Sequence, residues 1–216
     1  MFKKNYARYY EVFNESKPYK REAKFVYDWA GKPKSILDIG CGTANYWKHF
    51  TDDDIRIMGF EKSEAMIAKS EHKDKIVCGD VQTDIIGSKH KYDTVTALFD
   101  VLNYMPTHNW WKKLPLKQGG FFIFDIWDND KVQEDGFSET KKMVRGVYRK
   151  ITPIVSDGKY VDLNVHFTDW EITFQEIHRM YIYSDKDIEM FCGNEFKIVD
   201  TKKTKTWQKF YKLIKK

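Results

Sequence analysis

The chain contains little cysteine and no long apolar run. Its three cysteines, Cys41, Cys78 and Cys192, lie far apart and form no C-x-x-C pair. This spacing argues against a disulfide framework or a zinc site and suits a reducing cytosol. No apolar stretch reaches the length of a membrane span, and the N-terminal segment lacks the apolar core of a signal peptide. We therefore expect a cytoplasmic protein that does not associate with membranes.

The size and charge of the chain set further bounds. Its 216 residues, of which 42% are hydrophobic, suit a single α/β domain over 1–216. The net charge is +5, with much of the excess in the lysine-rich segment 202–216. A basic segment can attract phosphate groups, but a solvated surface is the simpler explanation. Charge alone therefore does not predict a nucleic-acid partner.

Apolar segments alternate with helical ones over the first 125 residues. Helices are expected at 18–30, around 46–50, from Ser63, and around 110–114. Buried strands are expected at 35–39, 55–60, 75–78, 92–99 and 120–124. This alternation predicts a Rossmann-like α/β fold, in which helices cover both faces of a mostly parallel sheet.

The pattern changes after about residue 138. Segments 144–148, 160–167 and 177–183 alternate like strands of an antiparallel sheet. Ser184 with Asp187 three residues later predicts a capped helix start, and two last strands follow at 196–200 and 206–213. We therefore predict a seven-stranded core sheet and an antiparallel β insertion, at about 138–184, over the active site.

A glycine-rich turn follows the first expected strand, in the segment ILDIGCGTAN at 36–45. Gly40 and Gly42 allow the backbone to approach a ligand at the carboxyl ends of the strands. Glu61 ends the second strand, where a carboxylate can accept hydrogen bonds from both hydroxyls of a ribose. Asp80 follows the third strand, placed to accept from an adenine amino group. Together these positions predict a site for a nucleoside-containing cofactor.

These segments, with CGDV, YDTVTALFDVLNYM and LPLKQGGFFIFD, resemble class I methyltransferases that use S-adenosylmethionine (SAM), in the family's order over about 35–125. The resemblance implies methyl transfer from SAM, with S-adenosylhomocysteine as the product. Ala44 stands where the family commonly has glycine, and a nicotinamide site is disfavoured because the third glycine of G-x-G-x-x-G is absent. The cofactor-binding residues that the resemblance implies are Tyr19, Asp38, Gly40, Cys41, Gly42, Asn45, Glu61, Lys62, Met66, Asp80, Val81 and Leu98.

The segment after the fourth strand bears on the methyl acceptor. Enzymes that methylate planar nucleobase nitrogens carry a [DNS]-P-P-[YFW] motif there, whereas this chain has LFDVLN without proline. The N-terminal YARYYE and the late insertion resemble the cap and flap of sugar N,N-dimethyltransferases. That resemblance implies a small-molecule acceptor, above all a nucleotide-linked amino sugar. A small-molecule or sugar O-methyltransferase is the near alternative. An RNA-binding methyltransferase, which is disfavoured, and a SAM-binding protein without catalysis are the alternatives from other classes, and a homodimer is left open.

Methyl transfer from a sulfonium is an in-line displacement, so placing the nucleophile supplies much of the catalysis. An amine must be neutral to attack, and a hydroxyl needs a general base. The family resemblance and the strand-end positions suggest His178, Tyr10 and Asp100 as catalytic residues, although His178 could be a half-buried strand residue and Asp100 a helix cap. No residues have metal-ligand spacing, so no metal is expected. The expected substrate-binding residues are Tyr6, Asn103, Trp127 and Arg179.

Overall fold

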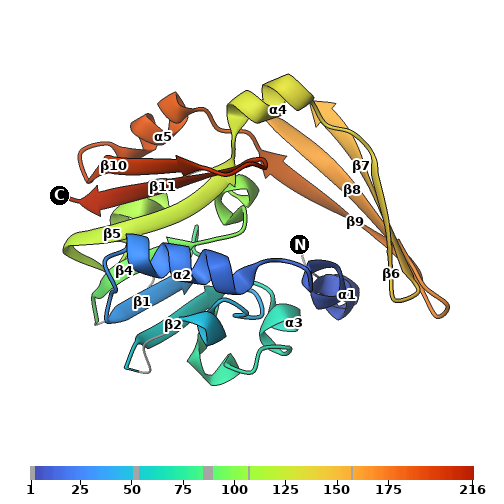
Figure 1. Cartoon of the computed structure of the whole chain (residues 1–216), viewed down its shortest axis with the longest axis horizontal. Coiled ribbons are helices and arrows are strands. Elements are labelled where there is room, and N and C mark those ends of the chain that lie inside the picture. Colours follow the sequence, from blue (N-terminus) through green and yellow to red (C-terminus); the bar gives the residue numbers. More distant parts are fainter. Residues whose placement is uncertain (1–2, 51–53, 85–89, 107, 157) are drawn as a thin grey trace.

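A seven-stranded sheet forms the centre of the computed structural model, which describes residues 3–50, 54–84, 90–106, 108–156 and 158–216 (Figure 1). The strand order is β10-β11-β5-β4-β1-β2-β3, with β11 antiparallel to both of its neighbours and the other pairs parallel. This sheet and the separate antiparallel sheet described below confirm the predicted fold class. The strands are β1 (Ser35–Ile39), β2 (Arg56–Glu61), β3 (Ile76–Cys78), β4 (Tyr92–Ala97), β5 (Leu116–Trp127), β10 (Phe196–Lys203) and β11 (Gln208–Lys215).

Apolar side chains pack on both faces of this sheet. Along β5, Phe122 and Phe124 belong to one buried cluster and Ile123 to the other, because successive side chains point to opposite faces. The helix α2 (Tyr19–Trp29) covers the face of Ile123, and α5 (Asp185–Cys192) covers the opposite face. Each fully buried side chain of this kind stabilises the fold by about 1.5–3 kcal/mol. The sheet is therefore a rigid platform for the residues at its strand ends.

Three of the expected helices are only short turns. Segment 46–50 forms the 3-10 turn η1 (Trp47–His49), and the helix expected from Ser63 is one turn, α3 (Glu64–Ile67), capped by the Ser63 hydroxyl. The helix expected around 110–114 is the 3-10 turn η4 (Asn109–Lys113). In η1 the indole N–H of Trp47 donates to Asp38 Oδ2 at 2.8 Å, and this bond holds the segment against β1. A further 3-10 turn, η2 (Lys73–Lys75), precedes β3.

A second, four-stranded antiparallel sheet lies within the expected insertion, with the order β6-β7-β8-β9. We call this sheet, Thr140–Tyr181, the flap; the short helix α4 (Asn129–Asp135) leads into it. The prediction of one strand over 144–148 is wrong, because Arg145 and Gly146 both have positive φ and form the hairpin turn between β6 and β7. The capped start of α5 at Ser184 is confirmed. The flap strands are β6 (Thr140–Val144), β7 (Val147–Ser156), β8 (Tyr160–Thr168) and β9 (Thr173–Tyr181).

The N-terminal helix α1 (Lys4–Asn14) lies between the flap and the core sheet (Figure 1). Its buried Tyr9 and Phe13 pack on Phe167 of β8, with ring centroids 5.8 and 5.5 Å apart. Ion pairs Arg8–Glu171 and Arg145–Glu15 flank this contact. In the part of the chain that the structure describes, no helix is both long and apolar enough to cross a membrane.

Candidate active site

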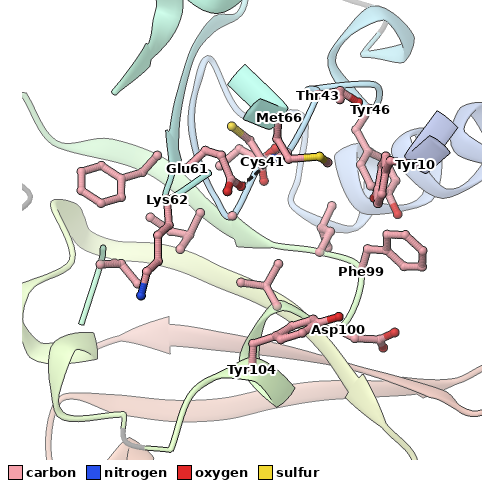
Figure 2. Close-up of a pocket in the computed structure, with 18 of the residues that line it drawn as sticks. Tyr10, Cys41, Thr43, Tyr46, Glu61, Lys62, Met66, Phe99, Asp100 and Tyr104 are labelled. Carbon is pink, nitrogen blue, oxygen red and sulfur yellow. Dashed lines mark hydrogen bonds between the residues drawn. The ribbon is translucent and has the colours of Figure 1, made fainter. Parts of the chain in front are cut away.

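A cavity of about 220 Å³ opens at the carboxyl ends of the parallel strands (Figure 2). Figure 2 shows Glu61 and Lys62 toward one end and Tyr10, Phe99 and Asp100 toward the other. We call the part formed by the ends of β1, β2 and β3 the strand-end half. The part formed by α1, the flap and η3 (Val101–Tyr104) is the flap half. All twelve residues expected to bind the cofactor line this cavity.

The turn after β1 requires glycine for two reasons. Gly40 and Gly42 have φ of +64° and +57°, a region that other residues rarely adopt. A Cβ on Gly40 would also lie 2.7 Å from both methyl groups of Val101, and one on Gly42 would lie 3.3 Å from Cε of Met66. The turn therefore exposes backbone to the cavity without side chains in the way.

Glu61 is held at the end of β2 by the backbone around it. Its Oε2 accepts from the N–H of Gly42 at 2.9 Å, and its Oε1 accepts from the N–H of Ser63 at 2.7 Å. Burial raises the pKa of Glu61, and these two hydrogen bonds oppose the increase. Each carboxylate oxygen keeps further acceptor capacity, which suits the two adjacent hydroxyls of a ribose.

Two more carboxyl groups line the strand-end half. Asp38 is buried and accepts from Trp47 and from the Thr96 hydroxyl at 2.8 Å, and burial raises its pKa to about 6. Asp80 lies 2.6 Å from Lys62 Nζ. Burial would raise the pKa of Asp80, but the hydrogen bonds from Lys62 and Gln82 outweigh it and keep the pKa below its usual value. The donors and acceptors in this half fit the adenosine and methionine parts of SAM.

The boundary between the two halves is a strained turn. Phe99 and Asp100 have φ of +72° and +60°, which is costly for residues other than glycine. Both backbone N–H groups donate to the Asp125 carboxylate, at 2.6 and 3.1 Å, and Gln208 also donates to it. Burial, together with the charge of Asp125, raises the pKa of Asp100 to about 8. The two carboxyl groups therefore titrate as a pair.

Aromatic hydroxyl side chains line the flap half. Tyr6 and Tyr10 come from α1, and Tyr104 comes from the turn after β4. The Tyr104 hydroxyl lies 3.1 Å from Nδ1 of His178, and the Tyr6 ring lies 4.7 Å from the His178 ring. Burial lowers the pKa of His178 to about 4, so its imidazole is neutral at pH 7. His178 lies behind Tyr6 and Tyr104 instead of among the residues that line the cavity.

Three of the expected substrate-binding residues lie elsewhere. Arg179 is on the outer face of the flap, where it forms two 2.8 Å hydrogen bonds with Asp162, because its neighbour His178 occupies the inner face. Trp127 lines a neighbouring cleft, 6.3 Å from the ring of Trp207. Asn103 is fully buried and donates to the carbonyl of Tyr181 while accepting from the N–H of Trp127. Asn103 thus connects the flap to the core.

Other residues line the cavity that the sequence analysis did not identify, among them Tyr104, Arg149 and Phe99. Arg149 lies two residues from buried Val147 and from partly buried Ile151, and both of these pack in the apolar cluster under the flap. This two-residue spacing would have placed Arg149 on the inner face of the flap, had the hairpin turn been recognised. Tyr104 lies in a short 3-10 turn that has no clear sequence signal.

Comparisons with known proteins point to the same chemistry. Residues 36–115 match the model of a methyltransferase domain family. A dTDP-3-amino-3,4,6-trideoxy-alpha-D-glucopyranose N,N-dimethyltransferase of Streptomyces venezuelae is 24% identical over 185 residues, which cover 78% of this chain and 77% of that protein.

Two solved structures share the fold over nearly the whole chain. An S-adenosylmethionine-dependent methyltransferase from Clostridium acetobutylicum is 22% identical, with a TM-score of 0.79 and 95% of each chain covered. The SAM-bound amino pentose methyltransferase CalS10 from Micromonospora echinaspora is 19% identical, with a TM-score of 0.77, covering 98% of this chain and 96% of that one. These two structures show that the chain shares their fold. With the methyltransferase-domain match and the methyltransferase relative, the chain is a SAM-dependent methyltransferase, with SAM as its cofactor.

Proposed function

We propose that this methyltransferase transfers the methyl group of SAM to the amino group of a nucleotide-linked amino sugar. The observation that carries the proposal is the flap half of the cavity, where Tyr6, Tyr10 and Tyr104 surround a space next to the strand-end half. Such side chains offer ring faces and hydroxyl groups, which suit a small polar acceptor. The similarity to a dimethyltransferase of a dTDP-linked amino sugar, which extends over 78% of the chain, supports the same acceptor class.

SAM supplies an electrophilic methyl group on a sulfonium when it is bound. The glycine turn, Glu61 and Asp80 would hold it, and the residues of the flap half would orient the acceptor. Correct placement of two reactants can supply about 7–11 kcal/mol of a barrier. Since α1 and the flap together border this half of the cavity, they also reduce the access of water to the reacting groups.

An amino sugar near neutral pH is largely an ammonium ion, which must lose a proton before its nitrogen can attack. Asp100 lies at the boundary of the two halves, and its raised pKa makes its carboxylate a stronger base than an ordinary aspartate. We propose that the Asp100 carboxylate takes up this proton, while Tyr10 hydrogen-bonds the acceptor. His178 is neutral and forms a hydrogen bond with Tyr104, so it would position the Tyr104 hydroxyl group next to the acceptor.

The experiment is to incubate the purified protein with SAM and a matched panel of nucleotide-linked sugars. Each pair in the panel has either an amino group or a hydroxyl group at the same ring position. We expect release of S-adenosylhomocysteine with the amino members alone, and mass spectrometry should show one or two added methyl groups on the sugar. Transfer only to hydroxyl members would contradict N-methylation, and transfer only to RNA would contradict the small-molecule acceptor.

A further inference from the structure

One cation of the flap half, Arg149, has no hydrogen-bond or ion-pair partner among the described residues. Arg149 lies on the inner face of the flap, opposite Phe167 in the register of β7 and β8. Its guanidinium group lies 4.5 Å from the ring centre of Phe13 in α1. Among the described residues it forms neither a hydrogen bond nor an ion pair, and its Nε atom is buried without a partner.

The other arginines near the flap differ from Arg149 in this respect. Arg8, Arg145 and Arg179 each form an ion pair with a carboxylate. The inner face of the flap also carries a buried carboxylate, Glu176, but it accepts from the backbone N–H of Lys3 and lies 3.6 Å from His178. No carboxylate of the described residues therefore neutralises Arg149.

Arg149 is partly buried, so part of its charge is removed from water with no anion of the described residues beside it. Burial lowers the pKa of Arg149, yet a guanidinium stays protonated in proteins, so it cannot avoid the cost by becoming neutral. Desolvating a charge without a partner is strongly unfavourable, whereas an anion in the correct position would offset that cost. The guanidinium presents a planar set of donors that matches two oxygens of one phosphate.

The location of Arg149 indicates which ligand would supply the anion. On α1, Tyr10 packs near Phe99, 6.4 Å away at the boundary of the strand-end half. Tyr6 and Phe13 instead contact Phe167, with centroid distances of 5.3 and 5.5 Å. Since Arg149 pairs with Phe167 in the flap, it belongs with the residues that face the acceptor.

We infer that Arg149 binds a phosphate group of the methyl acceptor, with its guanidinium donating to the phosphate oxygens. This inference rests on the proposed function, because it identifies Arg149 as the residue that recognises the nucleotide carrier of the sugar. It makes the diphosphate, and not the amino sugar alone, a determinant of specificity.

The test compares Arg149→Gln and Arg149→Lys with Lys150→Gln, which removes one positive charge from the next residue, on the opposite face of the same strand. Lys150 pairs with Glu139 at 2.9 Å and does not line the cavity. Calorimetry measures the binding of dTDP alone and of SAM alone, and thermal unfolding checks that each variant folds. Steady-state kinetics then give KM for the nucleotide-linked amino sugar that the panel identifies.

We expect Arg149→Gln to weaken dTDP binding and raise this KM by about 10- to 100-fold, in line with the loss of a charge-assisted hydrogen bond. SAM affinity should stay within about twofold, a change of less than about 0.5 kcal/mol. Arg149→Lys should restore part of the loss, and Lys150→Gln should behave like the original protein.

Two results would overturn the inference. In the first, Arg149→Gln leaves dTDP binding unchanged, or the original protein binds no dTDP. In the second, SAM affinity falls as much as dTDP affinity, which would assign Arg149 to the cofactor. The proposed function fails separately, if no nucleotide-linked amino sugar is methylated, because dTDP binding is measured without any turnover.

Discussion

The two halves of the cavity are built in different ways. In the strand-end half, backbone groups at the ends of parallel strands fix the side chains, as when Glu61 accepts from Gly42 and Ser63. In the flap half, side chains from α1 and the flap contact one another through rings, as Tyr6 contacts Phe167 and His178. Under the proposed function, this difference predicts that cofactor binding and acceptor choice can be altered separately. Mutations in one half should therefore leave the other half working.

The largest effect is expected from Gly40→Ala. The new Cβ would meet Val101 at 2.7 Å, a clash that costs about 1–3 kcal/mol, added to about 1–2 kcal/mol for the left-handed backbone. We expect SAM affinity, measured by calorimetry, to fall about 100-fold or more. Gly119→Ala is the control, because Gly119 has φ of +75° but no atom within 4 Å of a Cβ. Equal losses of SAM affinity in the two variants would show that the close contact does not matter.

Glu61→Gln should have the next largest effect, confined to the same half. The amide leaves one backbone N–H without an acceptor and removes a charged acceptor for the ribose, a loss of about 1.5–3 kcal/mol. SAM affinity should fall about 10- to 100-fold, while dTDP affinity stays unchanged. The control is Glu64→Gln in the neighbouring turn, which has no role in the cavity. A parallel fall in dTDP affinity would contradict the separation of the halves.

Asp100→Asn tests the boundary between the halves through pH. Because the pKa of Asp100 is raised to about 8, its carboxyl group holds a proton at pH 7 and becomes an acceptor as the pH rises through 8. We expect kcat/KM of the original protein to increase up to that pH. Asparagine tolerates the left-handed backbone and should lower kcat about 10-fold, less than a full general-base effect because some amine is already neutral.

At saturating SAM, the pH dependence of kcat/KM for Asp100→Asn should show only the titration of the acceptor amine. SAM affinity should hardly change, since Asp100 is not among the residues that fix the strand-end half. An unchanged profile with unchanged kcat would remove Asp100 from the proposed mechanism.

The smallest effect is expected from Tyr104→Phe. It removes the hydroxyl that bonds His178 at 3.1 Å, and one such hydrogen bond contributes about 0.5–1.5 kcal/mol. We expect kcat to fall about threefold, with SAM affinity unchanged. Tyr148→Phe, which changes a tyrosine next to Arg149 but on the other face of β7, is the control. A change in SAM affinity alone would assign Tyr104 to the cofactor.

Much of the fold could be predicted from local pattern. All five residues of β1 are buried, and Ile36, Leu37 and Ile39 make it a short, mainly apolar segment, which identified this strand. The helix expected around 46–50 was predicted from the helical spacing of Tyr46, Trp47 and Phe50. It does not form, because Trp47 donates a hydrogen bond to Asp38, nine residues earlier. A bond between distant elements leaves no periodic signal in the sequence.

The strand-end half was predictable because its residues follow fixed points along the chain. Gly40 follows β1, Glu61 ends β2 and Asp80 lies two residues after β3, and parallel strands bring those ends together. The flap half was less predictable, because a shift of one residue along a strand moves a side chain from the inner face to the outer face. Arg179 was therefore expected in the cavity, although Arg149 lines it.

The packing of α1 on the flap has a consequence for the evolution and engineering of acceptor choice. Residues 4–14 and 140–181 are separated by the whole cofactor-binding sequence, yet Tyr9 stacks on Phe167 and Arg8 pairs with Glu171. A flap transplanted from a relative would meet an N-terminal helix shaped for another partner. The two segments must be inherited or exchanged together, so a chimera with a new acceptor needs two crossover regions instead of one.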